Sequence, residues 1–113
     1  DFAPGQVVTV FRSRLRPDHA AAYGREAAEM ADLAATMPGL VDFKTFTADD
    51  GERVTIVTFA DEGSQAAWRT HADHAVAQRH GRESYYEEYS LQVCETRRVR
   101  RFVSPAAPPP ATT

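Results

Sequence analysis

Four segments of the chain are rich in β-branched and aromatic residues, as β-strands are. The four segments are residues 6–15, 40–47, 53–59 and part of 85–102. Asp49-Asp50-Gly51 lies between the middle two and is typical of a hairpin turn. We therefore predict four strands, the second and third of them joined as a hairpin.

Two other segments repeat their apolar residues every three or four positions, which is the period of an α-helix. The first covers residues 17–37, and the second is opened by Asp61-Glu62-Gly63-Ser64 and runs to about Ser84. Pro38-Gly39 ends the first helix, and Ser64 is the predicted N-cap of the second. The second helical region is open to a break near His71 or Gly81.

The resulting order, β-α-β-β-α-β, predicts a ferredoxin-like α+β fold with an antiparallel sheet and both helices on one face. Val54 and Ile56 should point to one face of the sheet, whereas Val57 and Phe59 should point to the other. Two helices can cover only one of these apolar faces. A second copy of the same sheet is the simplest cover for the other, so we predict a homodimer with its sheets face to face. The alternative is that these are half-buried residues of an exposed face.

Composition limits the domain organisation and the class of partner. Residues 1–103 fit one domain, and the Pro/Ala-rich residues 104–113 are predicted to be a disordered tail. The net charge of -3 provides no general attraction for nucleic acid, and the basic run 97–101 is interpreted as a solvated strand edge. No apolar run is long enough for a membrane helix. The single cysteine, Cys94, fits a reducing compartment, so we expect a cytoplasmic protein. The excess of Arg over Lys suggests a bacterial source.

The second helical region contains the most unusual side chains of the chain. It includes the only tryptophan and three of the four histidines. One stripe of this helix, at intervals of three or four residues, would consist of Trp68, His71, Ala75, Gln78 and Arg82. A helix used only for packing would fill such a stripe with aliphatic residues, so this stripe is the predicted functional surface.

This region also resembles a known family. The residues concerned are Ala67, Trp68, His71, His74, Ala77, Gln78, Gly81, Arg82, Tyr86 and Tyr89, followed by Val93-Cys94-Glu95 and preceded by Met37-Pro38-Gly39-Leu40, Phe43 and Asp50-Gly51-Glu52. Over about residues 6–101 they are similar to the antibiotic-biosynthesis-monooxygenase (ABM) family. The resemblance implies a dimeric α+β barrel with a pocket between sheet and helices in each protomer. It also implies a last strand that often reaches the partner.

The family contains cofactor-free quinone-forming oxygenases and haem-degrading enzymes, among other members. The haem-degrading relatives use an asparagine, a tryptophan and an iron-binding histidine. This chain has no asparagine, and the position of the iron-binding histidine falls near Gln78, whose amide is a poor iron ligand. Haem degradation is therefore disfavoured. The quinone-forming relatives also use an asparagine, so their mechanism does not carry over directly, although Trp68, Arg82 and Tyr86 could replace other parts of it.

The preferred hypothesis is a small monooxygenase of secondary metabolism that oxidises a phenolic or polycyclic aromatic compound with no permanently bound cofactor or metal. His71 or His74 would act as the base, and Arg82 or Arg12 would stabilise the phenolate. The ring would be framed by Trp68, Phe11, Phe43, Phe46, Phe59 and Tyr86, with Gln78 as a further substrate contact.

Other interpretations stay open from the sequence alone. The same pocket could only bind an aromatic ligand, or could support isomerisation or cyclisation by His/Arg acid-base chemistry. Each candidate also has a structural reading: the aromatic residues as core or dimer contacts, the histidines as helix-end residues, and Gln78 and Arg82 as ties to the last strand. A metal site built on His71 and His74 lacks the spacing of a zinc signature.

Overall fold

The computed structural model of the protein describes residues 1–71, residue 79 and residues 85–105. The elements follow the chain in the predicted order, with one short 3-10 helix added before the first α-helix. They are β1 (Val7–Leu15), η1 (Pro17–His19), α1 (Ala20–Thr36), β2 (Leu40–Thr47), β3 (Arg53–Phe59), α2 (Glu62–Thr70) and β4 (Tyr86–Glu95). The predicted bounds of the two hairpin strands are confirmed. No helix within the described residues is long and apolar enough to cross a bilayer.

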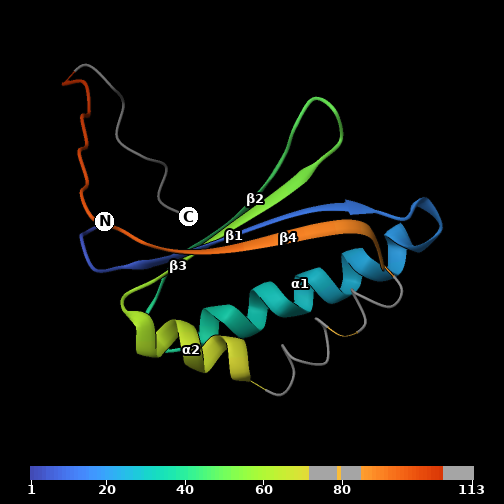
Figure 1. The fold of residues 1–113 in the computed structure, drawn as a ribbon, viewed down its shortest axis with the longest axis horizontal. Helices are drawn as coiled ribbons and strands as arrows, with labels where there is room; N and C mark the ends of the chain where they lie inside the picture. Colours follow the sequence, from blue (N-terminus) through green and yellow to red (C-terminus); the bar gives the residue numbers. More distant parts are fainter. Residues whose placement is uncertain (72–78, 80–84, 106–113) are drawn as a thin grey trace.

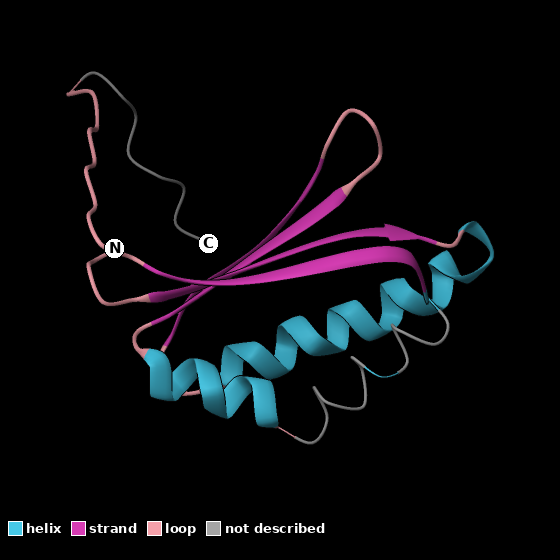
Figure 2. Cartoon of the chain, viewed as in Figure 1, coloured by secondary structure: helices cyan, strands magenta, loops and turns pink. Residues whose placement is uncertain are grey.

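The strands form one antiparallel sheet in the order β2-β3-β1-β4, so the first and third strands lie at its centre. Both helices lie on the same side of this sheet (Figures 1 and 2). Within this layer α1 contacts β2, and α2 contacts β3. The predicted ferredoxin-like α+β fold is confirmed.

The pairing register divides the strand side chains between two faces as the sequence predicts. Val7 pairs with Phe59 on the face toward the helices, whereas Val10 pairs with Ile56 on the opposite face. The opposite face also holds Val8 and Val54. These aliphatic residues of the opposite face are only half-buried, so the described part of the chain leaves this sheet face partly apolar and uncovered.

The hydrophobic core lies where α1 and α2 meet β3. Phe59 is fully buried, and the indole of Trp68 packs against it with ring centroids 6.3 Å apart. Ala34 of α1 and Val57 of β3 complete the buried centre. Trp68 is only 4% exposed, so the indole anchors α2 to the sheet and its large apolar area stabilises this contact.

Helix α2 begins within the predicted opening segment but has a different N-cap. Asp61, and not Ser64, is the N-cap: its Oδ1 accepts a hydrogen bond of 2.8 Å from the backbone N–H of Ser64. This hydrogen bond lowers the pKa of Asp61, because the amide favours the carboxylate form. The helix ends at Thr70, and His71 turns to an extended conformation, which confirms the predicted break near His71.

Candidate functional site

An aromatic cluster lies on the helix-facing side of β1 and β4. The ring of Phe11 meets that of Tyr86 edge-on, with centroids 5.4 Å apart, and Tyr89 lies 5.6 Å from Phe11 and 5.7 Å from Tyr86. The register of β4 against β1 shifts between Arg14 and Leu15. This irregularity brings Tyr86 and Tyr89, three residues apart, onto one face, where a regular strand would separate them.

The helix-facing side of β4 continues this cluster with apolar side chains that stay accessible. Leu91 and Val93 are 44% and 48% exposed, although they pair with Phe11 and Thr9 on the face that forms the core further along the sheet. Thr9 itself is 8% exposed, and its hydroxyl has no hydrogen-bond partner within the described residues. A row of accessible apolar and aromatic groups on an otherwise buried face is typical of a small-molecule site.

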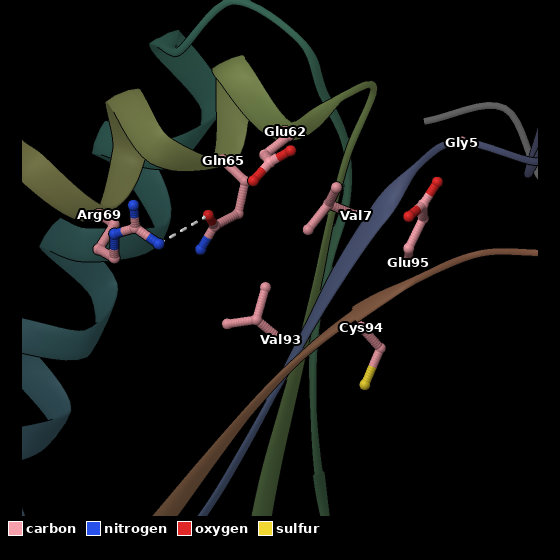
Figure 3. A pocket seen from close by; sticks show the side chains of 8 residues that line it. All are labelled: Gly5, Val7, Glu62, Gln65, Arg69, Val93, Cys94 and Glu95. Atoms are coloured by element: carbon pink, nitrogen blue, oxygen red, sulfur yellow. Dashed lines mark hydrogen bonds between the residues drawn. The ribbon is translucent and has the colours of Figure 1, made fainter.

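A cleft of about 250 Å³ opens beside this row, between α2 and the adjoining ends of β1 and β4. It is lined by Gly5, Val7, Glu62, Gln65, Arg69, Val93, Cys94 and Glu95. Val7 and Val93 lie on the sheet side, and Gln65 extends from α2 toward them (Figure 3). The cleft therefore has an apolar floor and a polar wall.

The polar wall contains two hydrogen-bond donors that hold each other in place. Nη1 of Arg69 donates to Oε1 of Gln65 at 3.4 Å, one helical turn apart on α2. Gln65 is 3% exposed, whereas Arg69 is exposed. The carboxylates of Glu62 and Glu95 lie at the rim of the same cleft, and both residues are exposed. The arrangement can hold a ring on the floor and a polar substituent at the wall.

The sequence model of the antibiotic biosynthesis monooxygenase family matches residues 6–80, which is more than half of the chain. The chain belongs to the antibiotic biosynthesis monooxygenase family. The uncharacterized protein YqjZ of Bacillus subtilis is 30% identical to it over 93 residues, which are 82% of each chain.

Solved structures of other proteins share the fold of this family member. The crystal structure of a mutant of SnoaB, a cofactor-independent oxygenase from Streptomyces nogalater, superposes with a TM-score of 0.72 at 16% identity, over 84% of this chain and 96% of that chain. A protein from Shewanella oneidensis superposes with a TM-score of 0.74 at 10% identity, over 85% and 95% of the two chains. At these identities the likeness establishes the fold alone.

The predicted site residues of this ABM protein divide into four groups, of which the first two lie in the aromatic cluster and in the core. Phe11 and Tyr86 meet in the aromatic cluster, at the surface where a ligand could reach them. Trp68 and Phe59 are buried in the core, and Phe43 packs against that core from β2. Trp68 and Phe59 therefore shape the site from behind, since almost none of their surface is accessible.

Two predicted residues lie on the opposite face of the sheet. Arg12 pairs with Glu52, with 2.7 Å between Nη2 and Oε1, and the hydrogen bond to Glu52 raises the pKa of Arg12. Phe46, 46% exposed, pairs across the hairpin with Val54 of that face. The structure does not bring either residue to the aromatic cluster or the cleft, because strand alternation separates them from Phe11.

The histidines and the helical stripe are only partly visible. His71 is half-buried at the end of α2, and its backbone N–H donates to the carbonyl of Trp68 at 3.2 Å. His74, Gln78 and Arg82 lie outside the described residues. In the described part of the chain, no group of three or more His, Cys, Asp or Glu side chains converges as a metal site would require.

Sequence reasoning missed Gln65 and Arg69. One signal was available: Gln65 lies three residues before Trp68, so a helix buries both on the same side. A polar residue at a buried helical position needs a hydrogen-bond partner, which here is Arg69. Gln65 also lines the cleft. The strand irregularity that brings Tyr86 toward the same side had no comparable signal.

Proposed function

We propose that this ABM protein is a monooxygenase-type oxidoreductase, which oxidises a phenolic or polycyclic aromatic compound in secondary metabolism without a permanently bound cofactor. The observation that supports this most is the aromatic cluster of Phe11, Tyr86 and Tyr89, which adjoins the cleft on one side of the sheet. From Phe11 to Val7 the strand advances ~13 Å, at about 3.3 Å per residue. That distance suits a flat molecule of several fused rings.

The chemistry requires a substrate that supplies its own electrons. A ring methylene activated by a neighbouring phenol would lose its two hydrogens and gain one oxygen atom from O2. The second oxygen atom would leave as water, so no external reductant is needed. The protein has to take up the phenolic proton, stabilise the resulting anion and exclude water.

The residue roles follow from this requirement. His71, at the end of α2, is the proposed base within the described chain, with His74 as the alternative base and Arg82 as the cation for the phenolate. Phe11 and Tyr86 would hold the ring from the sheet side. Trp68, Phe59 and Phe43 would contribute from the core, by fixing α2 and the floor behind the substrate. Arg12 and Phe46 could contribute only from the opposite face.

The opposite face of the sheet supports the proposal of a homodimer. A half-buried aliphatic surface lies there, and a second copy of the chain would cover it face to face. It consists of Val8, Val10, Val54 and Ile56. The proposed cellular location is the cytoplasm, where the single cysteine, Cys94, would stay reduced.

Oxygen consumption by the purified protein with a panel of anthrones and hydroquinones tests the proposed function. We expect protein-dependent uptake of O2 and a product that contains one new oxygen atom. Phe11→Leu should lower kcat/KM by up to about ten-fold, since a stacking contact contributes about 0.5–1.5 kcal/mol. Phe102→Leu is the matched control, because Phe102 is 83% exposed in the segment after β4.

Three results would contradict the proposal in distinguishable ways. No uptake with any compound, together with no binding, would leave the aromatic cluster without a role. Binding without uptake would indicate a protein that only sequesters its ligand. A product that gains no oxygen would indicate an isomerase or cyclase.

A further inference from the structure

The segment that follows β4 leaves the sheet. β4 ends at Glu95, and Thr96 still pairs with the N-terminal segment: its carbonyl accepts a hydrogen bond of 2.8 Å from Gly5, and its N–H donates one of 2.8 Å to the carbonyl of Gln6. Residues 97–103 then run away from the sheet on the side opposite the helices, beside the N-terminus (Figure 1). We call residues 97–103 the basic arm. The basic run of the sequence thus continues beyond the sheet and does not form its edge.

The basic arm separates the charges of the chain. Its four basic residues are all exposed, and they are Arg97, Arg98, Arg100 and Arg101. Nη1 of Arg101 lies 3.0 Å from Oδ1 of Asp1, whereas the other three arginines make no ion pair within the described residues. Residues 1–96 retain 9 of the 13 basic residues and all 16 acidic ones, so their formal net charge is -7. The arm is therefore a positive region that projects from an acidic domain.

Accessible apolar side chains accompany these positive charges. In the arm itself they are Phe102, Val103 and Val99, which are 83%, 59% and 37% exposed. Phe2, 53% exposed, belongs to the same region, because the ion pair between Asp1 and Arg101 places the N-terminus beside the arm. Basic residues interleaved with accessible apolar groups are typical of segments that lie on an anionic membrane surface. There the cations meet the headgroups, and the apolar side chains enter the interface.

The shape and the charge of the molecule favour a bilayer over a nucleic acid as the partner. A nucleic acid that ran past the arm would also meet residues 1–96, whose negative charge repels it. A bilayer can contact the arm alone, because seven extended residues reach up to about 20 Å, which is twice the screening length of about 8–10 Å at physiological salt. The aliphatic side chains of Val99 and Val103 also suit a lipid interface, since they cannot stack on bases.

We propose that the basic arm, together with Phe2, docks this protein on the surface of an anionic lipid bilayer. Its arginines would meet the lipid headgroups, and Phe102 would enter the interface beneath them. The cleft lies at the base of the arm, since Glu95 lines the cleft two residues before the arm begins. Apolar aromatic compounds leave water for a bilayer, so docking would hold the cleft where such compounds collect. The proposal goes beyond the proposed function and does not depend on it.

Sedimentation of the full chain with lipid vesicles tests this proposal. One kind of vesicle consists of phosphatidylcholine with about one third phosphatidylserine, and the other of phosphatidylcholine alone. We expect binding to the anionic vesicles at low salt and at least about ten-fold weaker binding to the neutral ones. Binding to the anionic vesicles should fall by a similar factor in about 0.5 M salt, which screens charges beyond about 4 Å.

Substitutions at exposed positions of the arm locate the contact without disturbing the core. Arg98→Gln and Arg100→Gln should each weaken binding to the anionic vesicles about five-fold, the usual contribution of one basic residue near such a surface. The charge-matched Arg25→Gln, at an exposed position of α1, should leave binding unchanged. Phe102→Ser should weaken binding about ten-fold, which is the smaller effect expected for removing a buried aromatic side chain. Phe102→Leu keeps an apolar side chain and should retain most of the affinity.

Equal binding to the two kinds of vesicle would overturn the proposal, and so would arm variants that bind as well as the wild type. A single-stranded oligonucleotide that binds more tightly than the anionic vesicles and displaces them would also overturn it and assign the arm to nucleic acid. Loss of a dimer in light scattering of Arg98→Gln or Phe102→Ser would assign the arm to a second copy of the chain. Oxygen uptake with anthrones, measured without vesicles, tests the proposed function separately from each of these results.

Discussion

Replacing Gly39 by alanine should destabilise the protein more than the same replacement at Gly51, and the reason lies in α2. Both glycines have a positive φ, +86° and +90°, which alanine adopts at a penalty of about 1–2 kcal/mol. At Gly51 an added Cβ would meet nothing within 4 Å. At Gly39 it would lie 2.6 Å from Cβ of Ser64 and closer still to Oγ of that residue, in the first turn of α2.

The overlap at Gly39 adds a packing penalty to the conformational one. Overpacking of this kind costs about 1–3 kcal/mol. We therefore expect a loss in the free energy of unfolding of about 1–2 kcal/mol for Gly51→Ala and about 2–5 kcal/mol for Gly39→Ala. The carbonyl of Gly39 also accepts a hydrogen bond of 2.7 Å from Ala60, so the loop has little freedom to move away.

A double-mutant cycle in urea denaturation separates the two penalties. Ser64→Gly removes the atoms that the new Cβ would meet, so it should recover about 1–3 kcal/mol in the Gly39→Ala background and destabilise the wild type slightly, as glycine does in a helix. Equal losses at the two glycines, or additive effects of Gly39→Ala and Ser64→Gly, would refute this account of how the loop before β2 contacts α2.

Three further predictions concern the core, the hairpin and the uncovered sheet face. Trp68→Ala should lower the free energy of unfolding by about 3–5 kcal/mol in urea, and Trp68→Phe by clearly less, because the indole is 4% exposed and packs on Phe59. The pKa of Asp50 is lowered from 3.8 by the backbone amide of Glu52 and by its pairing with Arg14, so the stabilising effect of the Asp50 carboxylate is present above pH 4 and is lost as the pH falls through the lowered folded pKa. The Asp50→Asn variant should therefore flatten the acid side of a curve of Tm against pH. An unchanged curve would contradict this reasoning. Ile56→Glu should convert a dimer to a monomer in light scattering, whereas a dimer that persists would argue against the face-to-face arrangement.

The strands and their faces could be predicted because successive side chains of a strand point to opposite faces of the sheet. Val57 and Phe59 point to the helices, and Val54 and Ile56 point away, as their spacing requires. The N-cap was placed wrongly at Ser64 because several residues before α2 can cap a helix, and only the geometry shows that Asp61 does so.

The site was less predictable, since its residues depend on tertiary contacts. Arg12 is one residue from Phe11, yet it lies on the other face and pairs with Glu52, a partner forty positions away in the chain. The contact between Phe11 and Tyr86 depends on a strand irregularity that no local pattern announces. Gln65 looked like an ordinary helical residue until the structure placed it in the lining of the cleft.

A crystal structure of the protein soaked with a hydroxyanthraquinone, a product-like aromatic, tests the central claim most directly. The account predicts the fused rings on the helix-facing side of β1 and β4, in contact with Phe11, Tyr86 and Tyr89 and beside the cleft. Rings bound on the opposite face beside Val10, or a protein that stays empty at saturating ligand, would contradict it.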